Sequence, residues 1–110
     1  MNRMSIIVAL ALIGLSVINV ANAGQWTGWG DADRIYSHSQ SYLSYLTPAE
    51  LHINPDECPR ARPYKFDRSQ ENSKEIFQML LTAKLSGFKV RAYLSECVGS
   101  YPRILYLEVK

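Results

Sequence analysis

The most regular alternation of hydrophobic and polar positions lies in the last quarter of the chain. Residues 88–95 carry an apolar side chain at every second position, with Lys, Arg, Tyr and Ser between them. Residues 103–109 repeat the pattern, with Leu105 on the apolar face. Because successive side chains of a strand point to opposite faces, both segments are predicted to be β-strands with one buried face. Residues 98–102 form the predicted loop between them.

Three further strands are predicted in the first part of the domain. Residues 26–36 are rich in aromatic residues and contain two glycines, and glycine inside a strand indicates a bulge or a sharp bend. Short apolar segments follow at 41–46 and 64–67. Three prolines lie in the segment 54–63 between these two strands, so this segment is predicted to be a loop.

One α-helix is predicted over residues 73–86. Its apolar residues recur with helical spacing at positions 76, 77, 80 and 83. Asn72 and Glu75 have the spacing of a capping box at the start of the helix. Gly87 supplies the expected stop.

The predicted order is three strands, one helix and two strands, which is the order of a five-stranded OB-fold barrel. In that arrangement closure of the barrel removes exposed sheet edges, and the helix covers one end with its apolar stripe. The fold class is therefore mainly β with one helix. An open α+β sandwich with the same strand order is the alternative.

The first 23 residues have the pattern of a secretory signal peptide. Arg3 gives a positive start, residues 6–15 are apolar, and Ala21-Asn22-Ala23 is a small-residue cleavage site. A membrane anchor is the alternative, but the apolar run is short for a span. We expect cleavage after Ala23, leaving a single domain at 24–110 with no membrane span. Its expected location, reached by the general secretory route, is the periplasm or the exterior of the cell.

The two cysteines, Cys58 and Cys97, are predicted to form a disulfide, because an exported chain meets an oxidising compartment. Two cysteines and two scattered histidines match no metal-ligand spacing, so neither a metal nor another cofactor is expected. No serine has a histidine in a nucleophile setting, and the protein is expected not to be an enzyme.

Charge and aromatic residues indicate binding. The 110 residues hold 12 Lys plus Arg against 10 Asp plus Glu, a balance that argues against a nucleic-acid partner held by bulk electrostatics. Trp29 is expected to be partly exposed as a stacking platform, and Trp26 to lie in the core. Two groups of basic residues are expected to be solvated surface. For the first group a subunit contact is the alternative, and its residues are Lys89, Arg91 and Tyr93. For the second group contact with an anionic envelope surface is the alternative, and its residues are Arg60, Arg62, Lys65 and Arg68.

Four segments of the sequence carry a resemblance to known proteins: 25–28, 33–37, 86–91 and 101–102. Together they resemble small exported OB-fold proteins of proteobacteria and, more distantly, the pentameric B subunits of subtilase cytotoxin and typhoid toxin. The toxin subunits bind sialylated glycans at cell surfaces. The resemblance therefore implies an exported binding module that recognises a glycan or an envelope surface, and a homo-oligomer. The alternative is a periplasmic protein–protein interaction or inhibitor module without a sugar site.

The resemblance also implies a glycan pocket. The family uses an Asp and a Ser four residues apart, a spacing that Asp33 and Ser37 keep here. The family's tyrosine on the strand after the helix aligns with Leu94, one position after Tyr93. With the stacking platform included, the expected ligand-binding residues are Asp33, Ser37, Tyr93 and Trp29.

Overall fold

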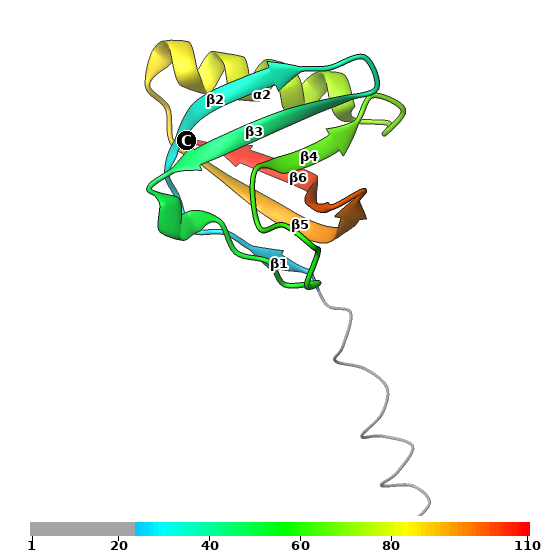
Figure 1. Cartoon of the computed structure of the whole chain (residues 1–110). Helices are drawn as coiled ribbons and strands as arrows, with labels where there is room; N and C mark the ends of the chain where they lie inside the picture. Colours follow the sequence, from blue (N-terminus) through cyan, green and yellow to red (C-terminus); the bar gives the residue numbers. More distant parts are fainter. Residues whose placement is uncertain (1–23) are drawn as a thin grey trace, which may run out of the picture.

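A computed structural model describes residues 24–110, which contain six β-strands, one α-helix and one 3₁₀ helix (Figure 1). The predicted signal peptide lies outside these residues and stays a prediction. The elements in chain order are β1 (Gln25–Trp26), β2 (Asp31–Ser37), β3 (Ser41–Thr47), η1 (Ala49–Leu51), β4 (Tyr64–Asp67), α2 (Ser73–Ser86), β5 (Val90–Val98) and β6 (Tyr101–Val109). Neither helix of the described range is long and apolar enough to cross a bilayer.

All six strands belong to one sheet, in the order β1-β5-β6-β4-β3-β2. Neighbouring strands are antiparallel except β4 and β6, which run parallel with Lys65 opposite Arg103. The sheet is therefore mixed. The predicted class, mainly β with one helix, is confirmed, whereas the predicted closed barrel of five strands differs from this six-stranded sheet with two ends.

The strand count differs because the predicted first strand is interrupted between β1 and β2. Within the interruption, buried Thr27 donates its backbone N–H to the carbonyl of Ala92, and its hydroxyl accepts the N–H of Ala92. Gly30 then exchanges two backbone hydrogen bonds with Val90, of 2.9 and 2.8 Å. The continuous segment from β1 to β2 therefore forms both end strands of the sheet. It pairs with β5 first, through β1, Thr27 and Gly30, and then with β3, through β2.

Gly30 is required by close packing at this crossing. A Cβ atom at position 30 would overlap both the side chain of Leu51 and the carbonyl oxygen of Thr47. The carbonyl belongs to the backbone of β3 and cannot rotate away. The sequence therefore needs a residue without a side chain where β2 begins.

The helix α2 has the predicted bounds and lies across β2 and β6 (Figure 1). Gly87 ends it in the left-handed conformation, at φ 75°. The predicted capping box is wrong, because the Asn72 side chain makes no cap bond. Instead it donates to the carbonyl of Leu105 at 3.0 Å and accepts a bond from Gln70. Asn72 therefore attaches the start of the helix to β6.

The core lies between the sheet and α2. Alternation in β5 is confirmed for Val90, Ala92 and Leu94, which are fully buried, whereas Phe88, predicted on the same face, precedes the strand and is 46% exposed. In β6 the pairing register shifts opposite Leu94, so Ile104 enters the core and Leu105, predicted on the core face, is only half-buried. The buried core consists of Ala32, Tyr42, Leu46, Tyr64, Phe66, Ile76, Leu80, Ala83, Val90, Ala92, Leu94, Ile104 and Leu107.

The predicted disulfide is confirmed. Cys58, in the long loop before β4, is bonded to Cys97 near the end of β5, with 5.8 Å between their Cα atoms. The loop is also tied locally, because the Asn54 side chain makes two hydrogen bonds of 2.8 Å with the backbone of Cys58. A disulfide of this kind indicates an oxidising, non-cytoplasmic environment.

Candidate functional site

A row of aromatic rings covers the outer face of β1, β5 and β6. Strand register creates the row, because Trp26 lies opposite Tyr93 and Tyr93 lies opposite Tyr106. The ring centroids are 5.3 Å apart in the first pair and 5.7 Å apart in the second. We call this surface the tryptophan face, and its residues are Trp26, Trp29, Arg91, Tyr93, Tyr106, Glu108 and Lys110.

Two cations lie against the indole rings of this face. The guanidinium carbon of Arg91 is 4.5 Å from the ring centroid of Trp26 and 5.0 Å from that of Trp29. Lys110 Nζ is 4.4 Å from the centroid of Trp29. Such cation–π contacts stabilise the position of both partners. Arg91 therefore links the two indoles into one continuous surface.

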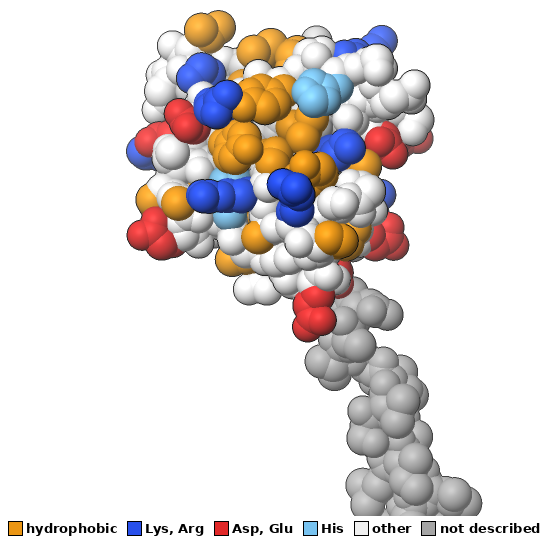
Figure 2. All heavy atoms as spheres, in the orientation of Figure 1, with side chains coloured by type: hydrophobic (Ala, Val, Ile, Leu, Met, Phe, Trp, Pro, Cys, Tyr) orange, Lys and Arg blue, Asp and Glu red, His pale blue; other side chains and the backbone are white. Residues whose placement is uncertain are grey.

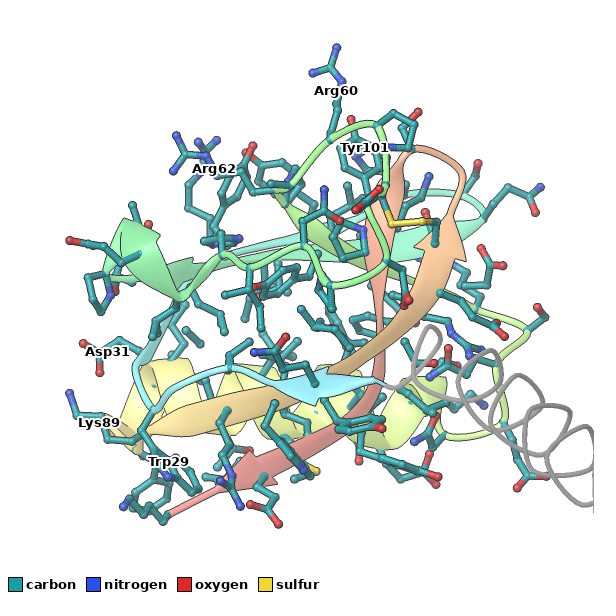
Figure 3. All side chains as sticks on the ribbon, turned by 90° about the horizontal axis from the view of Figure 1, so that it is seen from below. Trp29, Asp31, Arg60, Arg62, Lys89 and Tyr101 are labelled. Carbon is teal, nitrogen blue, oxygen red and sulfur yellow. A yellow bond between two sulfur atoms is a disulfide. The ribbon has the colours of Figure 1, made fainter. Side chains whose placement is uncertain are left out.

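Charge on the tryptophan face is largely balanced. Arg91 Nε donates to Glu108 Oε1 at 2.6 Å. At the end of the face, Lys89 Nζ forms a 2.8 Å ion pair with Asp31, and both lie beside Trp29 in Figure 3. The surface is therefore aromatic, with one Arg–Glu pair and one further cation, Lys110, over Trp29, and it lacks the large excess of one charge that a charged polymer would need.

The prediction that Trp26 belongs to the core is wrong. A regular strand would send Trp26 and Trp29 to opposite faces, but the chain between β1 and β2 is irregular and buries Thr27 instead. Both indoles are therefore half-buried on the outside, one on each side of Arg91. The prediction that Trp29 is partly exposed is confirmed.

The structure divides the predicted ligand-binding residues into two groups. Trp29 and Tyr93 belong to the tryptophan face. Asp33 and Ser37 lie on β2, where both residues are exposed. Of the hydrogen bonds within residues 24–110, none joins Asp33 to Ser37.

Each residue of the second group is engaged by a neighbouring cation. Asp33 lies at a β-bulge, and its carbonyl oxygen accepts a bond from Lys84 of α2. The Ser37 hydroxyl accepts a bond from the guanidinium of Arg68. The two residues thus contact separate parts of the structure, the helix and the segment after β4.

The sequence analysis missed three residues of the face, Tyr106, Glu108 and Lys110, of which Tyr106 is 53% exposed. The position of Tyr106 could have been found from the hairpin that joins β5 and β6. Val98 pairs with Tyr101 across a two-residue turn, and the two register shifts between this turn and Tyr93 cancel, so that Tyr106 lies opposite Tyr93 as simple counting along both strands predicts. The predicted loop over 98–102 hid this register, because β5 and β6 both extend into it.

The titratable groups with shifted pKa values serve the fold. Burial lowers the pKa of His52, whose Nε2 lies 2.9 Å from the backbone N–H of Leu46 and accepts its hydrogen. Burial raises the pKa of Tyr64, whose hydroxyl donates to the carbonyl of Leu51 and accepts the N–H of Ile53. These bonds hold η1 and the following loop against β3 and β4. Within residues 24–110 there is no group of three or more His, Cys, Asp or Glu placed to hold a metal.

Comparisons with known proteins do not assign this surface. No protein-family model, curated protein or solved structure matches the chain. The resemblance to exported OB-fold proteins and toxin B subunits therefore stays a prediction. The candidate site rests on its own geometry, an outward aromatic row on three adjacent strands.

Proposed function

We propose that the protein is an exported, non-enzymatic binding module that recognises a glycan through the tryptophan face. The observation that carries the proposal is the outward-facing row of half-buried Trp26 and Tyr93 and exposed Tyr106, extended by Trp29 across Arg91. Four aromatic rings gathered on one outer face of a small domain are typical of a surface that binds another molecule.

The chemistry of the face suits a sugar. A pyranose ring has an apolar C–H side that packs on an aromatic ring, and hydroxyl groups around its edge that need donors and acceptors. Glu108 supplies carboxylate acceptors and Lys110 supplies ammonium donors at the margin of the rings. Tyr93 and Tyr106 add phenol groups that both donate and accept.

The fold and the route of export are part of the same proposal. We infer that the sheet coils into an OB-type barrel, a view supported by the isolated bridge between Gly30, which precedes β2 at one end of the sheet, and Val90 of β5, the neighbour of β1 at the other end. The predicted signal peptide would carry the chain out of the cytoplasm, in agreement with the disulfide. Assembly into a ring, as in the toxin B subunits, is an expectation that the solution mass tests directly.

A glycan array followed by a fluorescence titration tests the proposal. Both tryptophans of the chain lie on the tryptophan face, so a sugar that stacks there changes the fluorescence directly. We expect Trp29→Ala and Tyr106→Ala each to weaken binding about tenfold, the order of one aromatic contact. The matched control is Tyr45→Ala, which removes a half-buried tyrosine from a different face.

The same titration separates the tryptophan face from the pocket implied by the resemblance. Loss of binding in Asp33→Ala and Ser37→Ala, with Trp29→Ala unchanged, would place the sugar at that pocket. Array-wide absence of binding by folded protein would contradict the glycan proposal as a whole.

A groove beside α2 supports the alternative, a protein–protein interaction or inhibitor module. The groove has a volume of about 430 Å³ and apolar walls that include Met79, Phe88 and Val109. Leu85, on the neighbouring turn of the helix, is 84% exposed. Under this alternative, Phe88→Ser and Leu85→Ser abolish capture of an envelope protein while glycan binding is absent.

A further inference from the structure

A second surface, on the opposite side of the molecule, combines aromatic rings with unpaired cations. Figure 3 shows Arg60, Arg62 and Tyr101 projecting from one side, and Trp29 from the other. We call the second surface the basic face. Its residues are Arg34, Tyr36, Tyr45, Arg60, Arg62, Lys65 and Tyr101.

Strand register places these side chains together. Across β2, β3 and β4, one row contains Tyr36, Leu43 and Lys65, and the next contains Arg34 opposite Tyr45. The Arg34 guanidinium carbon lies 4.9 Å from the centroid of Tyr36 and 5.5 Å from that of Tyr45. Hydrophobic side chains form the centre of this face in Figure 2, with Lys and Arg around them.

The long loop before β4 extends the face with two more arginines. Arg60 is held by its backbone N–H, which donates to the carbonyl of Ser100 at 2.8 Å. Arg62 lies close enough to His52 to lower its pKa by charge repulsion, although burial is the larger cause. The disulfide at Cys58 fixes this loop against β5. The two guanidiniums are therefore presented from an anchored loop.

Among residues 24–110, no carboxylate forms an ion pair with a cation of the basic face. The ion pairs formed within residues 24–110 are Lys89–Asp31, Arg91–Glu108 and Arg103–Glu96. None of these pairs uses Arg34, Arg60, Arg62 or Lys65. In Figure 2 the Asp and Glu side chains lie toward the margins of this view. The face therefore attracts anions, in contrast to the charge-balanced tryptophan face.

We propose that the basic face binds phosphate groups displayed on an anionic lipid surface. Arginine forks match phosphate oxygens with two parallel hydrogen bonds. Tyrosine rings beside them suit the polar–apolar boundary of a bilayer, where aromatic side chains with a polar tip are enriched. The disulfide indicates an oxidising, non-cytoplasmic environment, where lipid headgroups are more accessible than nucleic acids.

Vesicle co-sedimentation at low salt tests the proposal. The probes are vesicles of phosphatidylcholine alone and of phosphatidylcholine with about one-third phosphatidylglycerol. We expect binding only to the anionic vesicles, weakened by added salt. Each of Arg34→Gln, Arg60→Gln and Arg62→Gln is expected to lower the partition coefficient about fivefold, and the triple variant about a hundredfold. These three side chains are exposed, so the variants should fold.

Controls distinguish the source of phosphate and the role of each face. Lys74→Gln, which removes an exposed cation from α2, should leave vesicle binding unchanged, and so should Trp29→Ala. The vesicle experiment is therefore independent of the glycan proposal, and absence of glycan binding would leave its outcome unchanged. Glycerol phosphate at the same phosphate concentration should compete weakly, because it lacks the array of a lipid surface.

Several outcomes would overturn the proposal. They are equal binding to neutral vesicles, vesicle binding that survives the triple variant, full competition by free phosphate, and tighter binding of a single-stranded oligonucleotide to the same arginines.

Discussion

Reduction of the Cys58–Cys97 disulfide should lower the free energy of unfolding by about 4 kcal/mol. The two cysteines are 39 residues apart in sequence, and the chain-entropy model gives this value for a loop of that length. A domain of this size has a net stability of about 5 to 10 kcal/mol. The bond therefore supplies a large share of the margin that keeps the domain folded, and its loss should lower the melting temperature by roughly 20 °C.

Urea unfolding followed by circular dichroism measures the effect. The oxidised protein, the same protein with reductant, and the double variant Cys58→Ala/Cys97→Ala should be compared at one pH. The reduced protein and the double variant are expected to agree within about 1 kcal/mol. Reductant should have no effect on the double variant, which controls for its action elsewhere.

A loss below about 1 kcal/mol in both arms would refute the reasoning. It would mean that the long loop is held as firmly by other contacts, such as the bonds of Asn54 to Cys58 and of Tyr64 to Leu51. Those bonds would then have to survive reduction. Hydrogen exchange of the loop amides would show whether they do.

Three further changes have expected effects on stability. Gly30→Ala should cost about 1 to 3 kcal/mol in urea unfolding, because its Cβ would overlap the backbone of β3; an unchanged midpoint would contradict the close approach. Leu80→Ala should cost about 2 to 5 kcal/mol, because Leu80 lies on the buried face of α2 and is fully buried; Leu85→Ala, at an exposed position of the same helix, is the control. Since burial lowers the pKa of His52 in the folded state, the unfolded chain binds the extra proton first, and stability should fall as pH drops below about 6.5. His52→Gln should remove that part of the pH dependence, as measured by urea midpoints at about pH 7.5 and about pH 5.5.

Elements with a strong local pattern were predictable from the sequence. The helix Ser73–Ser86 and the strand Tyr64–Asp67 have the predicted bounds, because apolar spacing and a C-terminal glycine define them locally. The disulfide followed from cysteine number and compartment. These features depend on neighbouring residues or on a single pair, and they needed no knowledge of strand partners.

Features that depend on strand partners were less predictable. Trp26 lies outside the predicted core because its neighbour Thr27 is buried instead and forms hydrogen bonds with Ala92, a residue 65 positions away. The register shift in β6 exchanged Ile104 for Leu105 in the core. Asn72 contacts β6 rather than capping its own helix. In each case the outcome depends on a contact with another strand, which the local pattern does not encode.

The placement of the two aromatic surfaces makes the two proposals testable together. Trp29 and Arg62 project from opposite sides of the domain (Figure 3), so a membrane on the basic face would leave the tryptophan face directed away from it. One protein should then hold a vesicle and a soluble glycan at once. Binding of the sugar should neither displace the protein from anionic vesicles nor change its partition coefficient. Competition between the two ligands would show that they share one surface, and one of the two assignments would have to be withdrawn.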